Sequence, residues 1–162
     1  MLVDSHCHLD FPGLAEITDD VLAEMHAEGV SHLLCVSVNL TDFPRVLALA
    51  ERHPEVYASV GVHPDHEVKE EPSVATLASL AAHPRVIAIG ATGLDYYRLT
   101  DRPEWQRERF RTHIRAAIQC GKPLIIHTRE AAEDTLALLR EEGAMWVGGV
   151  MHCFTESQAV AE

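Results

Sequence analysis

Histidines with strand-like spacing are the residues of this sequence that are best suited to chemistry. His6 and His8 lie one residue apart in the segment LVDSHCHLD, flanked by Asp4 and Asp10. Successive side chains of a β-strand point to opposite faces, so both imidazoles should point to one face and Cys7 to the other. Two neighbouring imidazoles can share one metal ion, although this pattern alone is a weak indication of a metal site.

Three further histidines follow apolar runs and are expected at strand ends. His63 lies in GVHP, His127 follows LII, and His152 follows VGGVM. A single histidine in such a place is more often structural, but five at the same end of several strands indicate a shared site. A parallel barrel gathers its strand ends into one bowl, where converging histidines bind catalytic metals. We expect five other histidines to lie at the surface: His26, His32, His53, His83 and His113.

Charged residues follow the same strand ends. Asp95 and Arg98 belong to GLDYYR, and Arg129 comes two residues after His127. An arginine beside a metal cluster suggests a clamp for phosphate or carboxylate. A salt bridge at the rim of the barrel is an equally good interpretation.

The elements that position these residues alternate between strand and helix. Strands are predicted at 2–8, 32–38, 56–62, 86–94, 123–127 and 146–153. Helices are predicted at 18–28, 40–53, 73–82, 103–120, 129–142 and 157–162. The expected N-caps are Thr18, Thr41 or Asp42, and Ser73.

About six βα repeats predict a parallel sheet in an α/β protein. An open doubly wound sheet and a (β/α)8 TIM-type barrel both fit, but no Rossmann glycine fingerprint follows the first strand, which favours the barrel. A full barrel needs about 250 residues. The 162 residues therefore predict one domain over 1–162, a barrel that is C-terminally incomplete after about six units.

Composition limits the classes of function. The formal net charge is −12, whereas a protein that binds nucleic acid by charge alone should be basic. Positive charge for a polyanionic substrate would have to come from bound metal ions. Four cysteines without a C-x-x-C pair, no signal segment and no long apolar run predict a cytoplasmic protein with no membrane span.

Five motifs in order give the sequence a specific resemblance: DSHCHLD, GVHP, GLDYYR, KPLIIHTREA and MHCFTES. The chain resembles the TatD family of metal-dependent deoxyribonucleases, which are amidohydrolase-like barrels. The resemblance implies a two-metal 3′–5′ exonuclease that acts on single-stranded DNA ends and is monomeric when full length. It implies two divalent ions, Mg²⁺ or Mn²⁺ for activity, with Zn²⁺ also compatible with the site.

The resemblance also assigns residues to roles. His6 and His8 would bind one ion, and His127 and His152 the second. His63, Asp95 and Arg129 would be catalytic, and His63, Arg98 and Arg129 would contact the substrate.

Two departures from the family pattern bear on activity. The metal position that is usually a bridging glutamate is Ala91 here, within GATGLD. Strand alternation predicts that its side chain shares a face with Ile89 and Gly93 and points into the barrel mouth. A later aspartate of the family, near the last barrel strand, has no counterpart in these 162 residues. The loss of two anionic ligands weakens metal binding and leaves no evident general base, so we expect an impaired enzyme.

Two alternatives to the nuclease stay open. The same barrel supports hydrolysis of small molecules, although the bridging lysine common in those relatives has no counterpart near Ala91. A catalytically inactive fragment is the other alternative, and Ala91 favours it.

Overall fold

The structure is a computed structural model that describes residues 1–97, 99 and 103–162. Its strands are β1 (Leu2–Cys7), β2 (Val30–Cys35), β3 (Val56–Val60), β4 (Val86–Asp95), β5 (Leu124–Arg129) and β6 (Gly149–Met151). Its α-helices are α1 (Thr18–Ala27), α2 (Phe43–Arg52), α3 (Val74–Ala81), α4 (Glu104–Cys120), α5 (Ala132–Glu141) and α6 (Gln158–Ala161). Short 3-10 helices, η1 (Ala15–Ile17) and η2 (Ala144–Trp146), precede α1 and β6.

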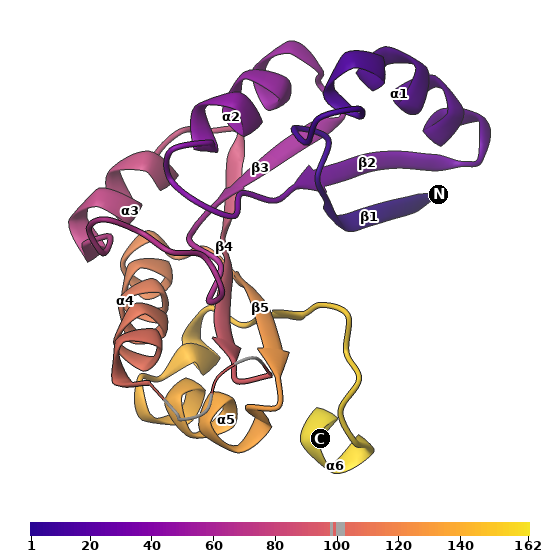
Figure 1. The fold of residues 1–162 in the computed structure, drawn as a ribbon. Helices are drawn as coiled ribbons and strands as arrows, with labels where there is room; N and C mark the ends of the chain where they lie inside the picture. The colour runs from indigo at the N-terminus through magenta and orange to yellow at the C-terminus, as the bar shows by residue number, and fades with distance from the viewer. Residues whose placement is uncertain (98, 100–102) are drawn as a thin grey trace.

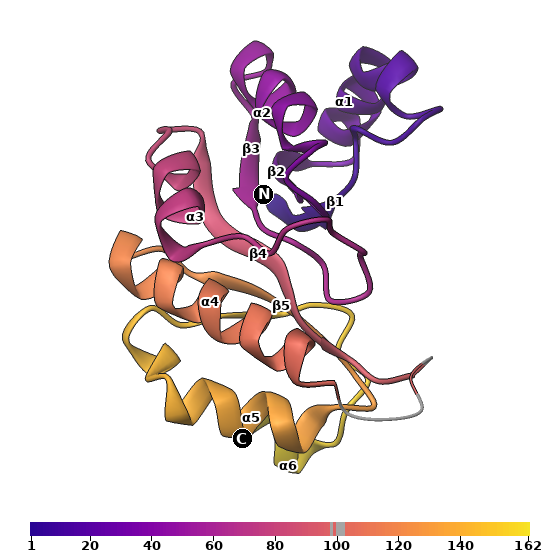
Figure 2. The same cartoon turned by 60° about the vertical axis from the view of Figure 1, so that its left-hand side comes forward.

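The strands form one parallel sheet in the order β1-β2-β3-β4-β5-β6. They follow one another around a curve, with α1 to α5 on its outer side (Figure 1; the turned view in Figure 2 agrees). A doubly wound sheet would reverse its strand order and carry helices on both faces. The sequential order and the single helical layer are those of six units of a (β/α)8 barrel, as predicted.

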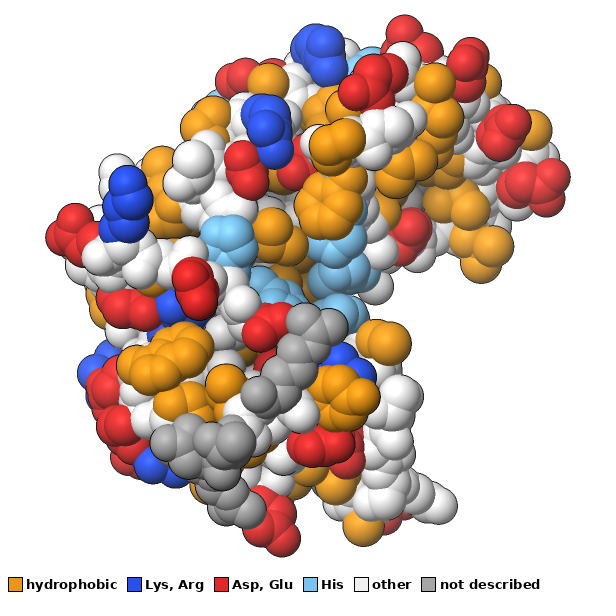
Figure 3. Space-filling view, viewed as in Figure 1, with side chains coloured by type: hydrophobic (Ala, Val, Ile, Leu, Met, Phe, Trp, Pro, Cys, Tyr) orange, Lys and Arg blue, Asp and Glu red, His pale blue; other side chains and the backbone are white. Residues whose placement is uncertain are grey.

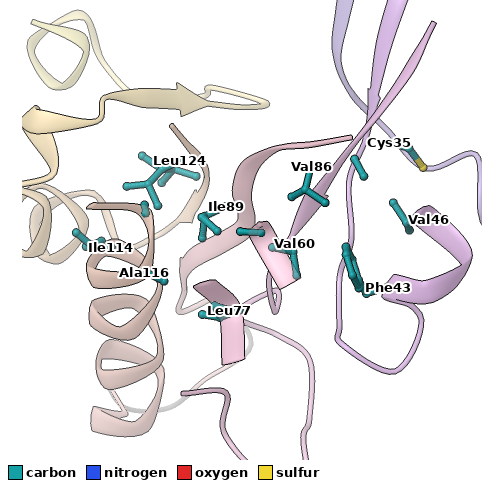
Figure 4. Packing of buried hydrophobic residues seen from close by; sticks show 14 of the residues in the cluster. Cys35, Phe43, Val46, Val60, Leu77, Val86, Ile89, Ile114, Ala116 and Leu124 are labelled. Atoms are coloured by element: carbon teal, nitrogen blue, oxygen red, sulfur yellow. The ribbon is translucent and has the colours of Figure 1, made fainter. Parts of the chain in front are cut away.

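Apolar side chains cover both faces of the sheet. On the outer face Cys35, Val60 and Ile89 pack against helical residues such as Phe43 and Ile114 in the main core (Figure 4). Cys7 packs against this outer cluster, on the side predicted from strand alternation. A smaller inner cluster consists of Leu34, Val36, Ala88, Ala91 and Ile125.

Two glycines allow β4 and β5 to approach closely. Gly93 pairs with His127 and has a φ of 135°, a conformation that side chains rarely adopt. A Cβ atom there would lie 2.0 Å from the carbonyl oxygen of His127. At Gly90, with a φ of 142°, a Cβ atom would lie 2.4 Å from the carbonyl oxygen of Ile125. The backbone of β5 at His127 therefore lies so close to β4 that only glycine fits at position 93.

One of the predicted N-caps is confirmed, and several other local predictions are wrong. Ser73 caps α3 by accepting the N–H of Thr76, as predicted. Thr18 does not cap α1, because its hydroxyl donates to carbonyls of the preceding turn, and Asp42 occupies the N-cap of α2 without a side-chain cap bond. The sixth strand is shorter than predicted, because a 3-10 turn takes up Trp146.

The expectation that His113 lies at the surface is wrong. Its side chain is fully buried under the sheet, in α4. Its Nε2 accepts the N–H of Val62 at 3.0 Å, and its Nδ1 lies 2.8 Å from the carbonyl oxygen of Arg109. Both ring nitrogens are bonded, which allows an imidazole to be buried.

Candidate metal centre

Five histidines gather at the carboxyl ends of the strands, and we call them the histidine cluster: His6, His8, His63, His127 and His152. They come from β1 and β5 and from the first to third residues after β1, β3 and β6. Figure 3 shows histidine side chains grouped at the middle of the inner edge of the molecule. Strands far apart in the chain thus contribute to one place, as the barrel prediction requires.

The spacing of His6 and His8 fits a shared ion. Their Nε2 atoms lie 3.2 Å apart, and Nδ1 of His8 lies 3.0 Å from the carbonyl oxygen of Val36. Two imidazole nitrogens that bind one tetrahedral ion at about 2.1 Å each would lie about 3.4 Å apart. The carbonyl of Val36 fixes the ring of His8 so that its Nε2 is the ligating atom.

His152 lies flat on His6, with ring centroids 3.8 Å apart and planes 16° from parallel. Nε2 of His152 and Nδ1 of His6 are buried without a hydrogen-bond partner among the described residues. Burial, with the neighbouring histidines, lowers the pKa of each to about 4. Both rings are therefore neutral at pH 7, the form that binds metals, and the buried, unpartnered Nε2 of His152 suits a ligand.

His127 and His63 form the other half of the cluster, with ring centroids 4.5 Å apart. Nε2 of His127 lies 2.9 Å from Oδ2 of Asp95. A carboxylate beside one ring nitrogen holds the proton there and leaves the other, Nδ1, free to bind a metal. His63 accepts the N–H of Asp65 on Nδ1, and burial, then the charge of His127, lowers its pKa to about 3.

Comparison with known proteins identifies the family of this chain. The family described as TatD related DNase matches residues 3–162. The chain belongs to this family. It is 43% identical over 163 residues to the metal-dependent hydrolase YcfH of Escherichia coli K12, covering 99% of this chain and 61% of that protein. The chain thus spans about three fifths of the length of such relatives.

Other TatD-family proteins are similar to this chain in sequence and in fold. The 3′-5′ ssDNA/RNA exonuclease TatD of Enterobacter lignolyticus is 35% identical over 95% of this chain and 60% of its own length. The crystal structure of YjjV, a TatD homologue from Escherichia coli K12, superposes with a TM-score of 0.91 and 28% identity over 99% of this chain and 62% of that one. A TatD-family hydrolase from Entamoeba histolytica gives a TM-score of 0.86 at 27% identity, over 98% of this chain and 60% of that one.

Ala91, the position at which the sequence departs from the expected glutamate, is buried among apolar side chains. Its side chain is 1% exposed and packs in the inner cluster with Leu34 and Ile125. The prediction that it shares a face with Ile89 is wrong, because the pairing of β4 with β5 shifts register between Ile89 and Thr92. Its methyl group offers no ligand on the inner face.

The described residues therefore supply only part of a metal site. Among residues 1–97, 99 and 103–162, no three side chains of His, Cys, Asp or Glu are arranged around one ion. The His6–His8 pair fits one ion with two imidazole ligands. The remaining cluster offers single ring nitrogens, which do not complete a second ion site by themselves.

Of the two predicted arginines, the structure describes Arg129, which ends β5 two residues after His127. Arg129 is exposed, and its guanidinium carbon lies 3.5 Å from the ring centroid of Tyr97. Tyr97 in turn donates its N–H to Oδ1 of Asp95 at 3.0 Å. Arg98 lies outside the described residues. None of the helices within the described ranges is long and apolar enough to cross a membrane.

Proposed function

We propose that this protein is a nuclease that hydrolyses phosphodiester bonds of DNA and removes nucleotides from the 3′ ends of single strands. The observation that carries the proposal is the His6–His8 pair, whose Nε2 atoms are 3.2 Å apart within a cluster of five histidines. The family supports a metal-dependent hydrolase, and the exonuclease name of the Enterobacter relative supports the substrate. The net charge of −12 fits a substrate that binds at the metal centre and not along a basic surface.

His6 and His8 would hold one divalent ion, and His127 and His152 would contribute to a second. Mg²⁺ or Mn²⁺ would serve activity, and Zn²⁺ is compatible with imidazole ligands. When bound, such ions supply an activated water and stabilise the leaving oxygen of a phosphodiester. We include a cytoplasmic location in the proposal, since all four cysteines are free thiols, which suits a reducing compartment. The resemblance to the family extends the proposal to a protein that is monomeric when full length.

The other residues have roles that follow from their contacts. His63 accepts the N–H of Asp65 on Nδ1, so its neutral ring carries the proton on Nε2 and can donate it to a phosphate oxygen. Asp95 fixes the ring of His127. Arg129, which is exposed next to these groups, and Arg98 would clamp the phosphate of a flanking nucleotide.

A second candidate is a form that binds nucleic-acid ends but hydrolyses them slowly. Ala91 favours it, because the inner face of β4 carries a methyl group where the family pattern has a carboxylate. Two imidazoles per ion do not offset the repulsion between neighbouring dications.

The test is degradation of single-stranded oligonucleotides labelled at the 3′ or the 5′ end, with Mg²⁺ or Mn²⁺. A 3′–5′ exonuclease releases the 3′ label at once and converts the 5′-labelled strand to a ladder. Chelation and His127→Ala should abolish the activity, whereas His32→Ala, at an exposed histidine on β2, should not. Metal-dependent hydrolysis of small esters or amides without any cleavage of oligonucleotides would contradict the proposal.

A further inference from the structure

Helix α4 carries polar side chains on the face that it buries. Gln106 is 1% exposed, Arg109 is 3% exposed and His113 is fully buried. They are spaced by three and four residues, so they form one stripe along the helix. Buried polar groups cost free energy unless they are hydrogen-bonded, so the partners of this stripe show what it does.

Gln106 binds two strand ends at once. Its Oε1 accepts the N–H of Asp95 at 2.9 Å, and its Nε2 donates to the carbonyl of Asp95 at 3.2 Å. The same Nε2 donates to the carbonyl of Pro64 at 3.1 Å. One amide therefore connects the end of β4 to the turn that follows β3.

Arg109 holds the same turn. Its Nη1 donates to the carbonyls of His63 at 3.0 Å, Pro64 at 3.4 Å and His66 at 2.8 Å. Its Nε and Nη2 donate to the carboxylate of Glu71 at 2.7 and 2.6 Å, which neutralises the buried guanidinium. His113 adds a bond to the N–H of Val62, directly before His63.

All these contacts with the strand ends are to backbone atoms of segments that carry a cluster residue or a residue hydrogen-bonded to one. The segment 62–66 carries His63, and Asp95 forms the hydrogen bond to His127. A displacement of about 1 Å in such groups can reduce catalysis by about 100-fold. We infer that Gln106 and Arg109 are positioning residues that fix His63 and the Asp95–His127 pair in the site, an inference that rests on the proposed function.

The first test measures the histidines directly, without metal. ¹⁵N NMR of the ring nitrogens in the wild-type protein should show His127 protonated on Nε2. In Gln106→Met, which keeps the size but not the amide, His127 should become a mixture of tautomers. Arg109→Gln should change the ring resonances of His63 in the same way. The control is Arg115→Gln on the same helix, where the arginine pairs with Glu142 and its side chain is 53% exposed.

The second test measures kinetics with Mn²⁺ and a single-stranded oligonucleotide. We expect kcat to fall about 10- to 100-fold in Gln106→Met and Arg109→Gln, with KM changed by less than about threefold. Arg115→Gln should retain the wild-type kcat. A loss of stability alone would lower the amount of folded protein but would leave the tautomer of His127 in that protein unchanged.

The outcomes separate the two proposals. Folded variants with wild-type ring resonances would overturn the inference, whatever their activity. If Gln106→Met does not fold, Gln106→Asn carries the same NMR test, because it keeps the amide but draws it back from Asp95. A wild-type protein without nuclease activity would overturn the proposed function, and the NMR comparison would then decide the inference alone.

Discussion

Nε2 of His127 lies 2.9 Å from Oδ2 of Asp95, and the two residues are on neighbouring strands, β5 and β4. A histidine that binds metal commonly donates its other ring N–H to a carboxylate, which fixes the ring and raises its basicity. Asp95 is placed to do this for His127, so it acts on the site through that ring.

Replacement of Asp95 should therefore weaken metal binding more than it weakens the fold. We expect Asp95→Ala to lower the affinity for Mn²⁺ by about 10- to 100-fold, measured by calorimetric titration. Asp19→Ala removes a carboxylate that is 93% exposed and should leave the affinity unchanged. Equal affinities for the two variants would show that the Asp95–His127 bond does not serve the metal.

Restoration of a carboxylate at position 91 should couple stability to metal. In Ala91→Glu, the metal-free protein should melt at a lower temperature, because a charge replaces a methyl group among apolar side chains. Mn²⁺ should raise the melting temperature more than in the wild type, and the nuclease rate should rise about tenfold or more.

The matched control for this variant is Ala88→Glu, in the same inner cluster but nearer the start of β4. It should lose stability without any gain from Mn²⁺. Equal nuclease rates for the alanine and glutamate forms at position 91 would mean that a bridging carboxylate is not needed.

Because β4 and β5 lie so close together, a single methyl group added at Gly93 should strongly lower the stability of the fold. Gly93→Ala would place a Cβ atom 2.0 Å from the carbonyl oxygen of His127, at a φ of 135°. We expect a loss of about 3 kcal/mol in the free energy of unfolding, measured in urea, together with a displaced His127. Gly29→Ala, at a φ of 80° where the added Cβ would meet nothing within 4 Å beyond its chain neighbours, should cost about 1 kcal/mol. Similar losses in both variants would argue against steric contact as the cause.

Acid should destabilise the protein through its buried histidines. Burial lowers the pKa of His113 from 6.5 to about 4. Between these values the unfolded chain binds more protons than the folded protein, so stability is lost as the pH falls from about 6.5 towards about 4. From this residue alone, the free energy of unfolding should be about 2 kcal/mol lower at pH 5 than at pH 7.

The variant His113→Gln isolates this contribution. Glutamine does not titrate, and its oxygen can still accept the N–H of Val62. Urea denaturation at pH 5 and pH 7 should show a smaller difference for the variant than for the wild type, since His6, His63 and His152 titrate in both. An unchanged difference would exclude His113 as a source of the acid sensitivity.

Strand periodicity predicted the parts of the site that lie within one strand. The alternation in β1 was enough to place His6 beside His8, and the repeating βα pattern was enough to place the strand ends together. Strand alternation places position 91 on one face with Ile89, but a register shift in β4 breaks that alternation, and Ile89 packs in the outer cluster while Ala91 packs in the inner one.

Contacts between segments that are distant in the chain could not be predicted from the sequence. His113 bonds to Val62, 51 residues away, and nothing in the helical pattern of α4 indicates that partner. The buried polar spacing of Gln106, Arg109 and His113 was the available signal. It resembles an ordinary polar face of a surface helix until the backbone that it binds is known.

Strand order has a consequence for how the protein is made. Each strand of the sheet pairs with the strand of the preceding unit, so a nascent chain can add one unit at a time to an existing sheet as synthesis proceeds. His6 and His8 leave the ribosome before the other histidines of the cluster, and His152 follows more than a hundred residues later. Early intermediates therefore expose the His6–His8 pair before the rest of the histidine cluster has been synthesised, so an ion bound by that pair at this stage would be enclosed by the units that follow.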